Sequence, residues 1–143
     1  MDTGPGYKNP KAREGWNKER EVRALELETR GIEVLLEEGM TETRREIILK
    51  QNPIGLAHMS RKVVAQHDSL VIENLGEIKV PTLLLIGEDD TPFMPAAQYM
   101  AKKIPDSELI IIPNAGHSAN VDNPEAFNRA VLDFLGKLNL TAN

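Results

Sequence analysis

The chain has 143 residues, 17 basic and 22 acidic side chains, a formal net charge of −5 and no cysteine. Its length allows one domain of ordinary size, and its negative charge argues against binding to nucleic acid or to an anionic membrane surface. The lack of cysteine excludes disulfides, thiolate metal sites and cysteine nucleophiles. Because the sequence has neither a long apolar run nor a signal-like N-terminus, we expect a cytoplasmic protein.

The first half of the chain predicts a helical region. Residues 1–10 are rich in glycine and proline and are expected to be loose. Residues 14–38 then carry apolar side chains at helical spacing, with Trp16 near the start of this helix. Gly39 is a residue suited to end it.

Two shorter helices are predicted next. Thr43 and Glu46 have the spacing of a capping box and open a short helix. Asn52 and Pro53 predict the N-cap and the first turn of a third helix, which runs toward Leu70.

The second half changes to the pattern of an α/β protein. Residues 80–87 are a short apolar run that ends at a glycine, and residues 108–113 are a second such run, so both predict buried strands. Residues 92–103 lie between them and have helical periodicity. Asn123 and Pro124 open a last helix. The order strand, helix, strand, helix predicts parallel strands joined by a crossover helix.

Two loops at the predicted strand ends could carry chemistry. Residues 87–90 place acidic side chains after the first strand, and residues 114–117 place His117 after the second. Since the carboxyl ends of parallel strands meet at one edge of a sheet, we expect Asp90 and His117 to lie close together. A carboxylate in that place orients the imidazole and stabilises its cation, so that the other ring nitrogen can act as a base.

Each residue also has an ordinary structural explanation. Asp90 precedes a predicted helix and could cap it. His117 could be a solvated loop histidine. The hypothesis of a functional pair depends on both residues occurring at the ends of consecutive strands.

Four short motifs follow one another in this half: PTLLLIGEDD at 81–90, AGH at 115–117, NPEAFN at 123–128 and DFL at 133–135. Their order and spacing over residues 78–138 resemble the C-terminal part of an alpha/beta hydrolase. The resemblance implies that Asp90 is the acid and His117 the base of a catalytic triad, with Asp89 an exposed neighbour.

The resemblance also implies a division of the chain. Residues 11–77 resemble the helical cap that covers such active sites, and residues 78–143 correspond to the C-terminal part of the hydrolase core. Residues 2–6 look like the tail of the strand that leads into the cap. By general appearance, the related enzymes are small-molecule esterases, enol-lactonases and carbon–carbon bond hydrolases.

The sequence departs from the family because it has no nucleophile elbow of the form Gly-x-Ser-x-Gly. None of its serines has flanking glycines in this pattern: Ser60, Ser69, Ser107 and Ser118. Ser118 is next to His117, but neighbouring loop side chains rarely meet. We therefore expect the nucleophile to lie outside this chain and the chain alone to be almost inactive.

The reaction implied by the resemblance is hydrolysis of a small ester, lactone or activated carbonyl compound, with neither a metal nor an organic cofactor. The strand at residues 82–86 would lack one neighbour, and an open apolar edge favours pairing with another chain. We expect a homodimer or a complementary N-terminal hydrolase half at this edge. The alternative function is a non-catalytic interaction or dimerisation module derived from a hydrolase.

The two remaining histidines give a weak signal. His58 and His67 are nine residues apart, which is poor spacing for one helical face, and no carboxylate cluster completes a metal site around them. They could line a substrate pocket under the cap, but positions on the helix surface are the simpler interpretation.

Overall fold

The computed structural model describes residues 4–141 of the chain, with side chains up to residue 138. The expected strand tail at residues 2–6 therefore lies partly outside the described residues. The chain forms two compact units instead of one ordinary domain. We call Gly6–Ser69 the helical unit, and we call the part from Leu70 onward, together with residues 4–5, the α/β unit.

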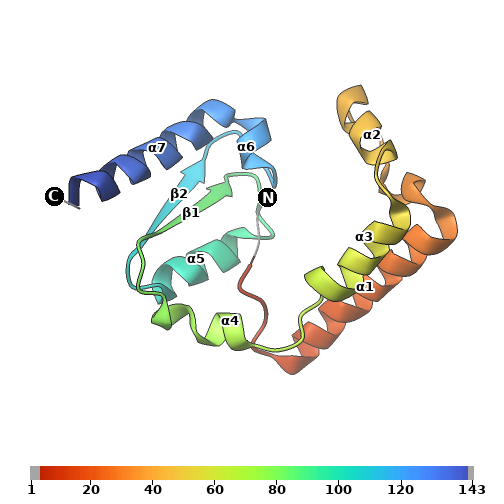
Figure 1. Cartoon of the computed structure of the whole chain (residues 1–143), viewed down its shortest axis with the longest axis horizontal. Coiled ribbons are helices and arrows are strands. Elements are labelled where there is room, and N and C mark those ends of the chain that lie inside the picture. Colours follow the sequence, from red (N-terminus) through yellow and green to blue (C-terminus); the bar gives the residue numbers. More distant parts are fainter. Residues whose placement is uncertain (1–3, 142–143) are drawn as a thin grey trace. The chain divides into compact units, whose positions relative to one another are not determined.

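The helical unit contains, in chain order, α1 (Pro10–Arg30), the 3₁₀-helix η1 (Ile32–Leu35), α2 (Glu42–Leu49), α3 (Pro53–Met59) and the π-helix η2 (Ser60–Val64) (Figure 1). Its small core consists of buried apolar side chains from α1, η1 and α3: Ala24, Leu27, Ile32 and Ala57. Few side chains are fully buried here, so polar contacts between the helices contribute to holding the unit together.

The prediction of one helix over residues 14–38 is wrong, because α1 ends at Arg30. Gly31 adopts a φ of +79°, which glycine tolerates and other residues rarely adopt, and its N–H donates to the Leu27 carbonyl at 3.1 Å. Gly39, the predicted end of the helix, lies in the loop after η1.

The predicted start of α2 is two residues late, and the predicted start of α3 is confirmed. Thr41, not Thr43, caps α2, and its hydroxyl accepts a hydrogen bond from the Arg44 N–H at 3.3 Å. Asn52 caps α3 by accepting from the Gly55 N–H at 3.0 Å, with proline at the first helical position.

The third helix ends at Val64, short of the predicted Leu70, and its last turn is held against α1. The Trp16 indole N–H donates to the Val64 carbonyl at 2.8 Å. The Asn17 side chain exchanges two hydrogen bonds with the backbone of Gln66, both at 2.8 Å. These bonds give Trp16 an anchoring function within the helical unit.

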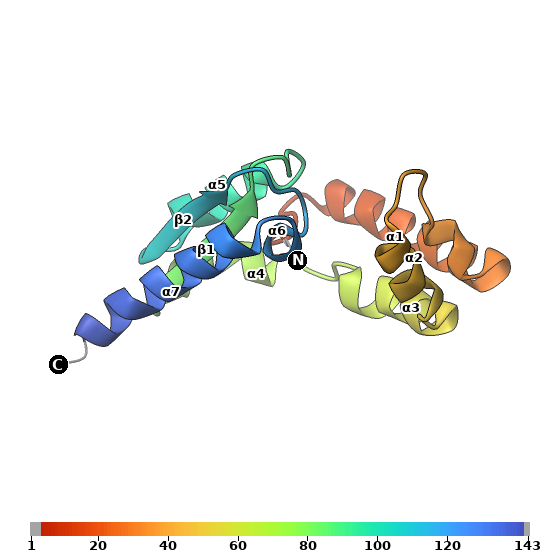
Figure 2. The same cartoon turned by 90° about the horizontal axis from the view of Figure 1, so that it is seen from above.

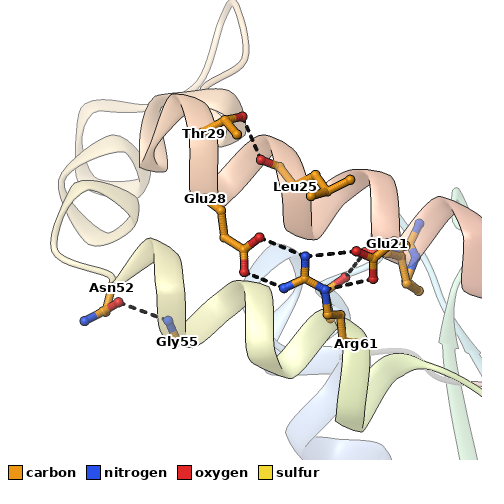
Figure 3. A network of polar contacts seen from close by, with 9 residues as sticks. Glu21, Leu25, Glu28, Thr29, Asn52, Gly55 and Arg61 are labelled. Carbon is orange, nitrogen blue, oxygen red and sulfur yellow. Dashed lines mark hydrogen bonds and ion pairs between the residues drawn. The ribbon is translucent and has the colours of Figure 1, made fainter.

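Arg61 joins η2 to two carboxylates of α1 (Figure 3). Its guanidinium donates to Glu21 through Nε and Nη2, at 2.8 and 2.9 Å, and to both carboxylate oxygens of Glu28. These hydrogen bonds lower the pKa of Glu21 and of Glu28 below the usual value of 4.5, and in turn they raise the pKa of Arg61. The paired charges therefore stabilise the helical unit only while both carboxylates are ionised.

This network predicts acid sensitivity. A carboxyl with a lowered pKa in the folded state stabilises the protein above its unfolded pKa, and this contribution is lost as the pH falls through the folded value. We expect Arg61→Met to lower the melting temperature at pH 6, and the difference from wild type to shrink as the pH falls below 4.5. Thermal unfolding followed by circular dichroism at each pH measures this.

The matched control is Arg129→Met. Arg129 pairs with Glu125 four residues earlier on the surface of the last helix, and both side chains are more than half exposed. Such exposed pairs contribute little to stability, so this variant should melt close to wild type. An Arg61→Met difference that does not depend on pH would contradict the ionic explanation.

The α/β unit contains α4 (Leu70–Glu73), the 3₁₀-helix η3 (Leu75–Glu77), β1 (Thr82–Gly87), α5 (Met94–Lys103), β2 (Ser107–Ile112), α6 (Ala119–Asp122) and α7 (Pro124–Thr141). The predicted order of strand, helix, strand and helix is confirmed, with α6 as an unpredicted short addition. No helix among residues 4–141 is long and apolar enough to cross a membrane.

The strands β1 and β2 are parallel and in register from Thr82 opposite Ser107 to Gly87 opposite Ile112. Figures 1 and 2 show α5 on one face of this sheet and α7 on the other. The core on the α7 side is made by buried apolar residues: Ile112, Ala115, Ala119 and Ala130. In the described residues the sheet has these two strands, so the outer edge of β1 carries no further strand.

Candidate active site

The two loops predicted to carry chemistry begin at the same edge of the sheet. Gly87 is the last residue of β1, and Ile112, its partner in the register, is the last residue of β2. The loops that follow β1 and β2 therefore start next to each other. This edge is the carboxyl end of the parallel strands, where open α/β sheets bind their ligands.

Gly87 allows the two loops to make backbone contact. A Cβ atom at this position would lie 2.2 Å from the Gly116 carbonyl oxygen and 2.3 Å from that of Ala115. With no side chain in the way, the Asp89 N–H donates to the Ala115 carbonyl at 2.9 Å. The absence of a Cβ at Gly87 thus brings the acidic loop against the histidine loop.

The structure brings Asp90 and His117 together. Oδ2 of Asp90 lies 2.9 Å from Nδ1 of His117. The Asp90 side chain is 5% exposed, whereas the His117 side chain is 50% exposed. A buried carboxylate therefore holds an imidazole that remains accessible from solvent.

The carboxylate of Asp90 does not cap the following helix. α5 begins at Met94 without a side-chain cap, and it is the backbone carbonyl of Asp90 that accepts from the Phe93 and Met94 N–H groups, both at 3.1 Å. Asp89, the neighbouring acid, is exposed. Of the two acids, Asp90 is the one whose side chain lies on the imidazole.

The contact determines which ring nitrogen is free for chemistry. A carboxylate on Nδ1 favours the tautomer that carries its proton on Nδ1. The Nε2 atom then has an available lone pair and can accept a proton from a nucleophile. Asp90 can stabilise the imidazolium that results.

The serines and histidines that the sequence did not place in the site also lie apart from this pair in the structure. Ser107 lies at the opposite end of β2 and donates to the carbonyls of Ala101 and Ile104. Ser118 precedes α6 and provides no side-chain cap there. His58 and His67 are exposed residues of the helical unit. Among the described residues, no group of three or more His, Asp and Glu side chains could hold a metal ion.

Comparison with known families decides the membership of this chain. Residues 9–130 match the profile described as "Alpha/beta hydrolase family". The chain belongs to the alpha/beta hydrolase family.

Solved hydrolase structures agree with this assignment. The chain is similar to MenH from S. aureus, with a TM-score of 0.83, 30% identity, and coverage of 94% of this chain and 56% of MenH. It is also similar to a thermophilic esterase from Thermogutta terrifontis, with a TM-score of 0.71, 28% identity, and coverage of 90% and 51%.

Among curated proteins, the chain resembles the 2-hydroxy-6-oxo-6-phenylhexa-2,4-dienoate hydrolase of Burkholderia cepacia. The two are 42% identical over 67 residues, which is 46% of this chain and 23% of that enzyme. The matched segments span about a third or less of the length of the curated relatives. They span about half of the solved structures.

Two residues of this hydrolase chain contact the site but were missed by the sequence analysis. The Phe93 ring lies 4.8 Å from the His117 ring, centroid to centroid, with the planes tilted by 53°. The Asp122 carboxylate accepts a hydrogen bond from the Gly116 N–H at 2.9 Å. The sequence feature that could have revealed Phe93 is its position three residues after Asp90, in the loop that holds the acid. No sequence feature pointed to Asp122, because it is an acid directly before the expected helix cap Asn123 and its contact with Gly116 spans a turn.

Proposed function

We propose that this chain supplies the acid and the base of a serine-type hydrolase site, with Asp90 orienting His117. The observation that carries the proposal is the 2.9 Å contact between a buried carboxylate and a half-exposed imidazole at the carboxyl ends of two parallel strands. Membership of a hydrolase family supports the same function. The nucleophile would come from polypeptide outside the 143 residues.

In this mechanism His117 moves a proton twice. Nε2 takes the proton of the serine hydroxyl while the serine oxygen bonds to the substrate carbonyl carbon. The imidazolium, stabilised by Asp90, then gives that proton to the leaving group as its bond to the carbonyl carbon breaks. Water repeats the sequence on the acyl-enzyme and releases the acid.

The proposed substrates are small esters, lactones or activated carbonyl compounds. Support comes from relatives named as an esterase and as a hydrolase of a 2-hydroxy-6-oxo-dienoate. We propose further that residues 11–77, most of which lie in the helical unit, correspond to the cap region of such a hydrolase.

The second candidate is an interaction or dimerisation module, and the open edge of β1 supports it. In the described residues no strand pairs with this edge, and isolated two-stranded sheets are marginally stable. A second copy of the chain or an N-terminal hydrolase half would complete the sheet along residues 82–86.

One experiment distinguishes the two functions. A chimera is made in which this chain replaces the matching part of MenH from S. aureus, so that the N-terminal part comes from that protein. If the proposal is correct, the chimera hydrolyses p-nitrophenyl acetate and reacts with a fluorophosphonate probe. His117→Ala should lower kcat by about 10⁴-fold.

His58→Ala is the matched control, because His58 is an exposed histidine of the helical unit, and it should leave the rate unchanged. Hydrolysis that survives His117→Ala would refute the catalytic proposal. A folded chimera with only background hydrolysis, together with sedimentation of the isolated chain as a stable dimer, would favour the interaction module instead.

A further inference from the structure

The short turn that carries His117 is closed by a residue outside the acid–base pair. Oδ2 of Asp122 accepts a hydrogen bond from the Gly116 N–H at 2.9 Å, and the Asp122 N–H donates to the Ser118 carbonyl at 2.9 Å. Gly116 and Ser118 are the two residues that flank His117. Asp122 thus binds the backbone on both sides of the imidazole-bearing residue.

We propose that Asp122 is a positioning residue that holds His117 on Asp90. The proposal rests on the proposed function of His117 as the base. Asp122 acts through the backbone: the orientation of the peptide between Gly116 and His117 sets the direction in which the histidine side chain leaves the chain.

The imidazole needs such support because packing alone does not hold it. Its side chain is half exposed, with Asp90 and the Phe93 ring as its contacts on the α5 side. An exposed side chain keeps several rotamers unless its backbone is constrained. Small displacements of a catalytic group reduce the rate substantially.

The short helix that carries Asp122 is held by its buried Ala119 and by its contacts with the turn, including the bond from the Gly116 N–H. α6 spans only Ala119–Asp122, and a helix of one turn is unstable by itself. A hydrogen bond from an N–H group to an ionised carboxylate is stronger than one between neutral groups. Figure 1 shows α6 next to the ends of the two strands, close to the histidine turn that Asp122 contacts.

The start of the same turn has separate anchors. The Asn123 side-chain amide donates to the Pro113 carbonyl at 2.9 Å, and the Asn114 N–H donates to a Glu88 carboxylate oxygen at 3.3 Å. Asn114 adopts a φ of +52°, which is uncommon for a residue other than glycine. These contacts hold the chain as it leaves β2, and the N–H groups of Asp89 and Val121 hold the carbonyls of Ala115 and Ser118. The Gly116 N–H, directly before His117, is the group that the Asp122 side chain fixes.

The test measures the tautomer of His117 in the 143-residue chain by long-range ¹H–¹⁵N NMR, at a pH where the ring is neutral. We expect the Nδ1–H tautomer to dominate in wild type. Asp122→Ala should shift the population toward Nε2–H and speed up exchange of the Gly116 amide proton by roughly tenfold. Asp122→Asn should keep the Nδ1–H tautomer and the slow exchange of the Gly116 amide proton, since the asparagine side-chain oxygen can accept the same hydrogen bond.

Asp133→Ala is the control, because Asp133 is an exposed acid on α7. It should change neither the tautomer population of His117 nor the exchange rate of the Gly116 amide proton. An unchanged His117 tautomer in a folded Asp122→Ala variant would overturn the proposal, even if the melting temperature falls. If Asp122→Ala does not fold, Asp122→Asn decides, because loss of the Nδ1–H majority in that variant would also overturn it.

Activity separates this proposal from the proposed function. In the chimera described above, Asp122→Ala should lower kcat by about tenfold to 10²-fold with KM unchanged. An inactive wild-type chimera with a tautomer that still depends on Asp122 would refute the hydrolase function and leave the positioning role intact. An active chimera with an unchanged kcat in Asp122→Ala would refute only the positioning role.

Discussion

Gly87→Ala is expected to destabilise the protein by roughly 3 kcal/mol, the upper part of the range for overpacking substitutions. The added Cβ would lie 2.2 and 2.3 Å from the carbonyl oxygens of Gly116 and Ala115. Both are backbone atoms in a loop held by several hydrogen bonds, so they cannot rotate away as a flexible side chain could. The end of β1 or the histidine turn must move instead.

Urea unfolding of wild type and of Gly87→Ala measures the loss in the free energy of unfolding. The same variant should weaken the contact between Asp90 and His117, because the backbone approach at Gly87 brings their loops together. The NMR signals of His117 should then resemble those of a solvated histidine.

The control for this experiment is Gly136→Ala. Gly136 is exposed on α7, and a Cβ there would have nothing within 4 Å. Since alanine favours a helix more than glycine does, this variant should be more stable by about 0.5–1 kcal/mol. Equal destabilisation of both variants would contradict the steric explanation at Gly87.

Asp90→Asn is expected to lower kcat of the chimeric hydrolase by about 10⁴-fold, because an amide cannot select the productive tautomer or stabilise the imidazolium as a carboxylate does. The side chain is nearly isosteric, so the fold should be retained. Circular dichroism and thermal unfolding check this point, and steady-state hydrolysis of p-nitrophenyl acetate gives the rate.

The chain offers a close control one residue earlier. Asp89 is an exposed acid in the same loop, and its backbone N–H donates to the Ala115 carbonyl of the histidine turn. Asp89→Asn should leave kcat within about twofold of wild type, because its side chain is exposed and Asp90 is the acid bonded to the imidazole. If Asp89→Asn reduced the rate as much as Asp90→Asn, the assignment of the acid would be wrong.

The α/β unit could be predicted largely from local patterns. Short apolar runs bounded by glycine and proline locate β1 and β2, and the Asn123–Pro124 pair marks the start of α7. The positions of Asp90 and His117 after consecutive parallel strands also predict their proximity, since the carboxyl ends of such strands share one edge.

The helical unit was predicted less well because its decisive contacts join residues far apart in the chain. A helical pattern continues past Arg30, yet the chain turns at Gly31, so that Ile32 packs with Ala24, Leu27 and Ala57 in the small core. The clamp of Arg61 on two glutamates of α1 joins residues at least 33 positions apart. Periodicity within a segment contains no information about such pairs.

Local sequence thus accounts for where the two strands lie, for the starts of α3 and α7, and for which acid and which histidine belong together, because caps, prolines and apolar runs act over a few residues. Tertiary structure decided how the pair is held: the bare backbone of Gly87 against Gly116, the ring of Phe93 on His117, and the carboxylate of Asp122 on the turn. These contacts arise only when two strands lie side by side and bring their loops within hydrogen-bonding distance.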